Sequence, residues 1–290
     1  MSTATSTPQP TINEPGRIQQ TDVTLRSTWR RIGPSVITIL NLTVFFIGWE
    51  IFARSGIVNN IFIPRPSDMF QTLWLGLTDP APIVTVGGNL ADHVLYSLRN
   101  LAVGVVLSCL IGIPLGLLMG ANRWVATILS PYVWAISSMP RIALVPLFII
   151  FLGFSVEMHL SIIVLSAVFP IMINSWAGVK TTDVSLLAAA RVFGARRIHL
   201  YTKVVFPFTL PFIIVGIQQG IGRGLVGLTI AEILGGSRGI GFLIVRSADS
   251  FNAPLMFGVL FILVMVSLGL IQITRWTEAK VAPWRSLDRI

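Results

Sequence analysis

The sequence predicts an all-α integral membrane protein with about six transmembrane helices. Of its 290 residues, 53% are hydrophobic and only 11% are charged, whereas a soluble domain carries roughly 25% charged residues. The apolar residues gather into runs of the length that a helix needs to cross a bilayer, about 20 residues. Lys and Arg are concentrated in alternate connecting segments, as the positive-inside rule expects for a multi-pass protein.

The expected spans follow one another along the chain. They cover residues 35–52, 98–119, 125–152, 160–178, 208–234 and 254–274. Residues 1–28 are rich in Ser, Thr, Pro and Gln, so they are expected to form a disordered cytoplasmic tail ahead of one membrane domain, residues 29–290. Two outer segments, 53–97 and 235–253, are each expected to contain a short amphipathic helix, at 67–77 and 240–245.

Glycine and proline mark the second and third spans. The second carries glycines at positions 112, 116 and 120, a spacing that lets helices pack backbone to backbone and that favours ordinary packing over a special dimer contact. The third is interrupted by Pro140, Arg141 and Pro146. Proline removes a backbone donor and kinks a helix, and irregular backbone at membrane depth survives only against protein or a wet cavity.

Charge predicts the orientation. With the connections assigned as above, fourteen Lys and Arg residues fall on one side, five on the other and two within spans. The basic side is expected to be cytoplasmic, with both termini there. The net charge of +9 therefore indicates retained cytoplasmic loops and not nucleic-acid binding.

Several kinds of chemistry are not indicated. Cys109 is the only cysteine, which excludes a disulfide within one chain, and His93, His159 and His199 lack the spacing of metal ligands. No phosphate-binding G-x-x-x-x-G-K-[ST] motif and no nucleophile motif occurs. The chain is expected to be a transport subunit with no cofactor of its own, and any ATP that drives it would be bound by a partner subunit. A membrane-embedded enzyme would need clustered ionisable residues, and those here are isolated.

Four polar residues within spans are candidates for a pathway or gate: Arg141, Gln218, Arg223 and Glu232. A charge at the centre of a span costs roughly 2.5–3.5 kcal/mol, so it usually faces protein or a cavity. Arg141 could instead snorkel or pair with a carbonyl, and Gln218 and the adjacent Gln219 could bond a neighbouring span. Glu232 fits a structural role in an external gate as well as it fits substrate contact.

A basic loop at about 181–207 separates two apolar runs. Asp183 or Thr182 can cap a helix here, which places Leu186, Ala189, Ala190 and Phe193 on one face before Gly194 ends it. Such a helix could dock into a groove of another protein or lie on the membrane surface.

This loop resembles the cytoplasmic coupling loop of ABC-importer permeases, in which Glu-Ala-Ala is followed after three residues by Gly and after nine more by Ile-x-Leu-Pro. Ala189, Ala190 and Gly194 match, while Ala188 replaces the Glu and residues 204–207 read VVFP. The chain is most similar to the nitrate/sulfonate/taurine branch. Further similarity lies at Pro140-x-x-Ala143-x-x-Pro146-Leu147, Ala231-Glu232, Gly239-x-Gly241 and Trp284.

The resemblance implies a type I ABC-importer permease in the inner membrane, forming a homodimer with the pathway between its subunits. It implies that cytoplasmic ATPase subunits dock on Leu186, Ala189, Ala190, Phe193 and Gly194. An extracytoplasmic binding protein would deliver a small solute, such as nitrate, a sulfonate or taurine. Hydropathy alone leaves a stand-alone secondary transporter or channel as the alternative.

Overall fold

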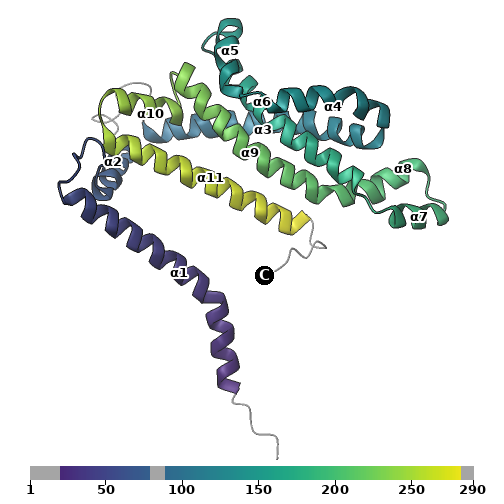
Figure 1. Cartoon of the computed structure of the whole chain (residues 1–290), viewed down its shortest axis with the longest axis horizontal. Coiled ribbons are helices and arrows are strands. Elements are labelled where there is room, and N and C mark those ends of the chain that lie inside the picture. Colours follow the sequence, from purple (N-terminus) through teal and green to yellow (C-terminus); the bar gives the residue numbers. More distant parts are fainter. Residues whose placement is uncertain (1–19, 79–88, 282–290) are drawn as a thin grey trace, which may run out of the picture. The chain divides into compact units, whose positions relative to one another are not determined.

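The computed structural model describes residues 20–78 and 89–281, and every regular element in these ranges is helical (Figure 1). Contacts divide the chain into two compact units at Ser55, so α1 belongs to one unit and all later elements to the other. The elements are α1 (Gln20–Arg54), α2 (Pro66–Thr78), α3 (Leu90–Ala121), α4 (Arg123–Ser138), the 3₁₀ turn η1 (Arg141–Leu144), α5 (Val145–Leu152), α6 (Val156–Lys180), α7 (Val184–Val192), α8 (Arg197–Leu200), the π-helical turn η2 (Tyr201–Val205), α9 (Phe206–Gly235), α10 (Ile240–Asp249) and α11 (Ala253–Val281).

The predicted fold class is confirmed. Five helical stretches in the described ranges are long and apolar enough to cross a membrane: Val36–Arg54, Leu90–Ala121, Val156–Lys180, Arg197–Gly235 and Ala253–Glu278. A sixth span is possible where α4 and the segment Arg141–Leu152 meet at an angle of 91°. The bend falls at Pro140, which has no amide hydrogen to continue the helix.

Two helix starts differ from the sequence prediction. Helix α1 begins at Gln20, so residues 20–28 are helical where a disordered tail was expected. Residues 1–19 lie outside the described ranges. Helix α3 begins at Leu90, within the expected outer loop. Asn89 and Asp92 form a reciprocal capping box that starts it.

Helix α6 is the centre of the second unit and packs along both α3 and α9. The glycines of the second span lie at the α3–α6 contact: a Cβ at Gly112 would come within 2.9 Å of the Val168 carbonyl oxygen. Side chains of Ile162, Ile163 and Ile171 on α6 are almost completely buried. The glycine spacing therefore serves helix packing inside one chain.

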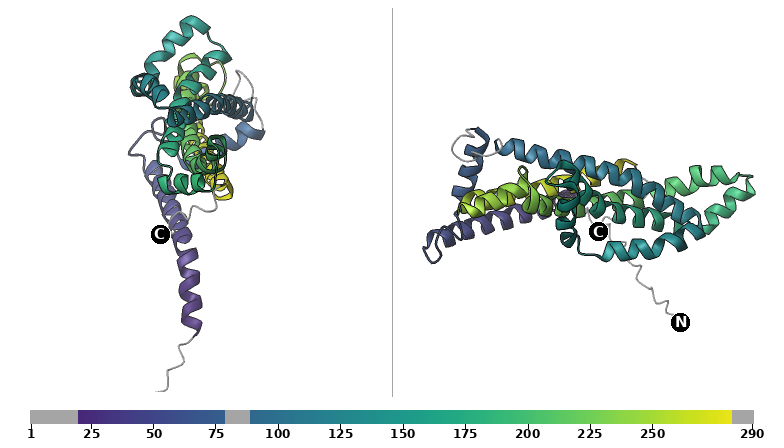
Figure 2. Two further views of the ribbon diagram at one scale, coloured as in Figure 1. Left: turned by 90° about the vertical axis from the view of Figure 1, so that its right-hand side faces the viewer. Right: turned by 90° about the horizontal axis from the view of Figure 1, so that it is seen from above.

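The two ends of this α3–α6–α9 bundle carry different elements. Helices α7 and α8 lie at the end where α6 finishes and α9 begins, and α10 lies at the other end, in Figure 1 and in the right-hand view of Figure 2. Helix α10 packs against α9, α11 and the start of α3. A buried apolar cluster joins α10 to its neighbours, and it consists of Leu73, Leu90, Ile240, Leu243, Leu255 and Val259.

Candidate functional site

The α7–α8 loop, residues 181–205, presents a helix to the surroundings. Helix α7 starts where predicted, because the Asp183 carboxylate accepts a hydrogen bond from the Ser185 amide at 2.8 Å. That backbone hydrogen bond also holds the pKa of Asp183 below its ordinary value. No residue of α7 itself is buried in this chain. The start of α7 is therefore fixed by its own cap, and few packing contacts with the bundle stabilise the helix.

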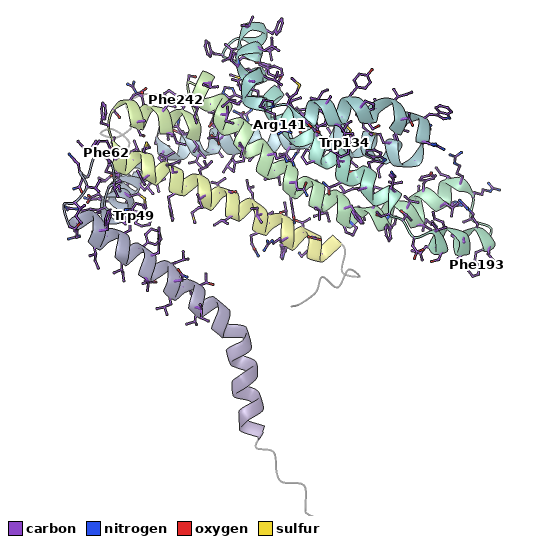
Figure 3. All side chains as sticks on the ribbon, viewed as in Figure 1. Trp49, Phe62, Trp134, Arg141, Phe193 and Phe242 are labelled. Atoms are coloured by element: carbon purple, nitrogen blue, oxygen red, sulfur yellow. The ribbon has the colours of Figure 1, made fainter. Side chains whose placement is uncertain are left out.

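Gly194 ends this helix in the left-handed conformation that the sequence favours, with φ at +75°. The Ala195 amide bonds back to the Ala190 carbonyl at 3.1 Å, which closes the last turn. Phe193 is the last residue before the turn, and 90% of its surface is exposed. Figure 3 shows it at the tip of the loop, away from the bundle.

The predicted docking residues share this exposed region. Leu186, Ala189 and Gly194 are exposed, and Ala190 is half-buried. The loop returns to the bundle through η2, a π-helical turn of the kind that is frequent at functional sites. The arrangement offers small residues and one aromatic side chain to a partner. Docking of ATPase subunits on these residues stays a prediction.

Glu232 lies in a different place, at the junction of α3, α9 and α10. Its side chain is 1% exposed. One carboxylate oxygen accepts a hydrogen bond from the Ser97 hydroxyl at 2.6 Å, and the other accepts one from the Gly241 amide at 2.8 Å. Glu232 is therefore fully engaged inside the protein.

The neighbouring amides of α10 are held in the same way. The Ile240 amide donates to the Ser97 hydroxyl oxygen at 2.8 Å, and the Gly239 amide donates to His93 Nδ1 at 3.0 Å. His93 also stacks on Phe242, with ring centroids 5.8 Å apart. Side chains of α3 and α9 thus satisfy the free amides at the start of α10.

A cavity of about 350 Å³ contains the other two charged candidates, Arg141 and Arg223. Ser166 lines it from α6, together with Gly222 of α9 and the apolar side chains of Ile142, Val226 and Ile230. Figure 3 shows Arg141 where the η1 turn meets the bundle. Arg223 and Glu232, both on α9, therefore belong to separate surroundings.

The two glutamines make contacts between helices. Gln218 Nε2 lies 3.5 Å from a carboxylate oxygen of Glu278 on α11, a long hydrogen bond. Gln219 accepts a bond from Asn174 of α6 at 3.3 Å. Both geometries match the alternative of bonding to a neighbouring span, and a role in a pathway stays a prediction.

Sequence reasoning missed three residues that the structure brings into these sites. Ser97 was assigned to the outer segment 53–97, just before the second expected span, and Glu278 lay beyond the predicted end of the last span. Ser166 looked like an ordinary polar residue of an apolar span. Polar residues inside a span are the signal that could have singled them out. Nothing local in the sequence indicates which of them meet.

Comparison with known proteins finds similarity to the membrane components of transport systems. Residues 112–284 match the family model described as "Binding-protein-dependent transport system inner membrane component". The chain is 28% identical over 238 residues to the putative aliphatic sulfonates transport permease protein SsuC of Bacillus subtilis (strain 168), covering 82% of this chain and 83% of that protein.

Two further relatives are similar over most of their length. The taurine transport system permease protein TauC of Escherichia coli (strain K12) is 29% identical over 90% of this chain and 94% of its own. The formylaminopyrimidine transport permease protein ThiX of Halalkalibacterium halodurans is 30% identical over 90% and 99%. A chain of the inward-facing MetNI methionine ABC transporter matches the fold with a TM-score of 0.57, at 19% identity over 66% of this chain and 95% of that one.

Proposed function

This chain belongs to the inner-membrane components of binding-protein-dependent transport systems, and we propose that its α7–α8 loop is the surface on which cytoplasmic ATPase subunits dock. The resemblance found in the sequence is confirmed: the chain is a multi-pass permease subunit of an ABC importer. The alternative of a stand-alone secondary transporter or channel is set aside by this membership.

The observation that carries the docking proposal is the exposure of Phe193 at the end of a capped helix. An aromatic side chain that is 90% exposed gains no stability from its own chain. Buried in a groove of a partner, the same side chain would act as an anchor, since truncation of such a residue typically costs about 2 kcal/mol or more of binding energy. Ala189 and Gly194 beside it are small enough to let the partner approach.

The rest of the assembly is proposed from the family and the charge pattern. Two copies of the chain would form the pathway between them, with both termini in the cytoplasm. An extracytoplasmic binding protein would deliver the solute, and ATP would be bound by the docked subunits and not by this chain. Closure of the ATPases would draw the two α7–α8 loops together. This movement would open the pathway between the two permease subunits toward the extracytoplasmic side.

The solute is proposed to be a small anion. A relative named for aliphatic sulfonates supports this class, and a nitrate carrier would fit the same description. A second relative is named for taurine, which carries the same sulfonate group together with an ammonium group. The relative named for formylaminopyrimidine shows that the family also includes carriers named for other solutes.

The experiment is a pull-down of the ATPase with the purified full-length permease. Phe193→Ala should weaken capture at least about tenfold and abolish stimulated ATP hydrolysis, because the anchor is lost. Phe154→Ala removes an aromatic ring that is 73% exposed at the opposite end of α6, and it serves as the matched control. Unchanged capture and hydrolysis in Phe193→Ala would rule out this loop as the docking surface.

A further inference from the structure

We propose that a basic hollow between the first turns of α4 and the last turn of α6 binds the phosphate group of an anionic phospholipid. The hollow has a volume of about 310 Å³, and its lining includes Arg123, Ala126, Thr127 and Ser130 of α4 and Trp176 and Lys180 of α6. The proposal goes beyond the proposed function, because it assigns a lipid ligand to a surface outside the α7–α8 loop.

The sequence places the lining side chains on one face of each helix. On α4 they recur at positions 123, 126, 127 and 130, which is the spacing of a single helix face, and on α6 Trp176 and Lys180 are four residues apart. A buried apolar cluster that includes Met119, Val133 and Phe169 joins α3, α4 and α6. The hollow is therefore formed by helices that pack on one another.

Charge selects an anion as the ligand. Arg123 and Lys180 both line the hollow, and no acidic residue is among its described lining residues. Neither side chain forms an ion pair with another residue that the structure describes. Lys180 Nζ lies 5.3 Å from the centroid of the Trp176 ring, a cation–π contact that orients the ammonium group without neutralising it. A phosphate oxygen would accept charge-assisted hydrogen bonds from both cations.

Position along the helices identifies a lipid as the source of this anion. Arg123 is the first residue of α4 and Lys180 is the last residue of α6, so both lie where the helices leave the hydrocarbon core and reach the headgroups. The α3–α4 turn lies at the same end of the bundle as α7 and α8 (Figure 1), the end that the charge pattern predicts to be cytoplasmic. Basic pockets between transmembrane helices on that side bind anionic headgroups.

The deeper part of the hollow suits the glycerol region of a lipid. Trp176 lies four residues before the end of α6, about 6 Å further into the membrane, at a level where tryptophan is enriched. The Ser130 hydroxyl forms no hydrogen bond with a described residue and is not buried. By contrast, the Thr127 hydroxyl bonds back to the Arg123 carbonyl oxygen at 2.9 Å. The accessible Ser130 hydroxyl can therefore donate to an ester carbonyl of the lipid.

The open shape of the hollow also fits a lipid. Arg123, Thr127 and Lys180 are exposed, so the hollow opens to the surroundings. Beside it on α4, Trp124 and Ile128 are 78% and 62% exposed. These two side chains form an apolar surface that acyl chains can cover while the headgroup occupies the hollow. The volume lies at the small end of ligand pockets, roughly 300–1,000 Å³, which is enough for a headgroup alone.

The test is native mass spectrometry of the detergent-solubilised full-length permease with equimolar phosphatidylglycerol and phosphatidylcholine. Both lipids carry a phosphodiester, but only phosphatidylglycerol has a net negative charge. We expect phosphatidylglycerol to be retained at least about tenfold more than phosphatidylcholine, because the choline ammonium group would meet two cations and no carboxylate. Equal retention of the two lipids would overturn the proposal.

Two charge variants locate the site. The double variant Arg123→Gln, Lys180→Gln should lower phosphatidylglycerol retention about tenfold or more and leave phosphatidylcholine retention unchanged, because it removes the charge-assisted hydrogen bonds. Lys203→Gln is the matched control, since it removes an exposed cation from η2, at the same end of the bundle, that does not line the hollow. Undiminished phosphatidylglycerol retention in the double variant would overturn the proposal.

A further pair of variants fills the hollow without changing charge. Thr127→Phe places a ring in the hollow at an exposed position and should also remove the preference for phosphatidylglycerol. Ile128→Phe changes the neighbouring residue, which is exposed but does not line the hollow, and should keep the preference. Thr127→Phe that keeps the preference would contradict the site.

Two other occupants are distinguished by the same samples. Inorganic phosphate in molar excess over lipid, at constant ionic strength, should not displace phosphatidylglycerol, because the acyl chains contribute to binding. Displacement by inorganic phosphate would show a site for a free anion and overturn the assignment to a lipid. If Thr127→Phe instead separates a dimeric permease into monomers on size-exclusion chromatography, the hollow is a contact between two copies of the chain and the proposal is wrong.

Discussion

The carboxylate of Glu232 and the backbone amide of Gly241 are 2.8 Å apart, and this contact fixes the start of α10 to α9. The N-cap residue of α10, Gly239, has no side chain with which to cap the helix. Glu232 and Ser97 supply that function from α9 and α3, because their side-chain oxygens accept the hydrogen bonds of the Gly241 and Ile240 amides. The role of Glu232 in this geometry is to hold elements together.

Replacement of Glu232 should therefore destabilise the protein. Glu232→Ala leaves the Gly241 amide and the Ser97 hydroxyl without their acceptor, and two buried polar groups without partners are expected to cost about 2–6 kcal/mol. Glu232→Gln keeps one acceptor for Gly241 and should cost less. Thermal unfolding of the purified permease, followed by tryptophan fluorescence, should rank the variants in that order.

Glu157→Ala provides the comparison, because Glu157 is an exposed carboxylate at the start of α6. Its melting temperature should stay close to that of the original protein. If Glu232→Ala melts like Glu157→Ala, the hydrogen bonds at α10 do not stabilise the fold.

Gly239 is the second residue on which this junction depends. Its φ is +113°, and a Cβ there would collide with the Glu232 carboxylate. Gly239→Ala should thus combine backbone strain with displacement of the buried carboxylate, and we expect a loss of folded, membrane-inserted protein. Size-exclusion chromatography of the solubilised membrane fraction measures the yield.

Gly153→Ala separates the two causes. Gly153 also has a positive φ, +68°, but a Cβ there meets nothing within 4 Å. Its stability should fall only by the backbone strain of an alanine at φ +68° and ψ −166°, a region almost limited to glycine, about 1–3 kcal/mol. Equal yields for the two variants would show that the contact with Glu232 is unimportant.

The α10 junction shows what the sequence could and could not predict. The pairs Ala231-Glu232 and Gly239-x-Gly241 are visible as motifs because they lie within about ten residues of each other on the chain. Ser97 is 135 residues before Glu232, and no local pattern joins the two. Long-range partners follow from helix packing, which hydropathy does not describe.

Local signals were more informative for α7. The cap at Asp183 and the left-handed turn at Gly194 depend on a few consecutive residues, so both were predictable. Helix α3 shows the limit of hydropathy: its first turns carry Asp92 and His93, which are too polar to count as a span, but a capping box starts the helix there. The cavity around Arg141 and Arg223 could not be predicted, because it depends on the bend at Pro140 and the sequence does not give the angle of that bend.

The last prediction concerns the backbone of the α7–α8 loop. Gly194 has a φ of +75° with open space around it, so a substitution there tests conformation separately from crowding within this chain. Asparagine tolerates the left-handed region, whereas a β-branched residue is strongly disfavoured there. Gly194→Asn should keep most stimulated ATP hydrolysis, and Gly194→Val should lose it while the permease still inserts and dimerises, because the bundle does not depend on this turn. Should both variants lose hydrolysis equally, the small size of the glycine at the ATPase contact, and not its conformation, would be the property that matters; should both retain it, the turn at Gly194 would have no part in coupling.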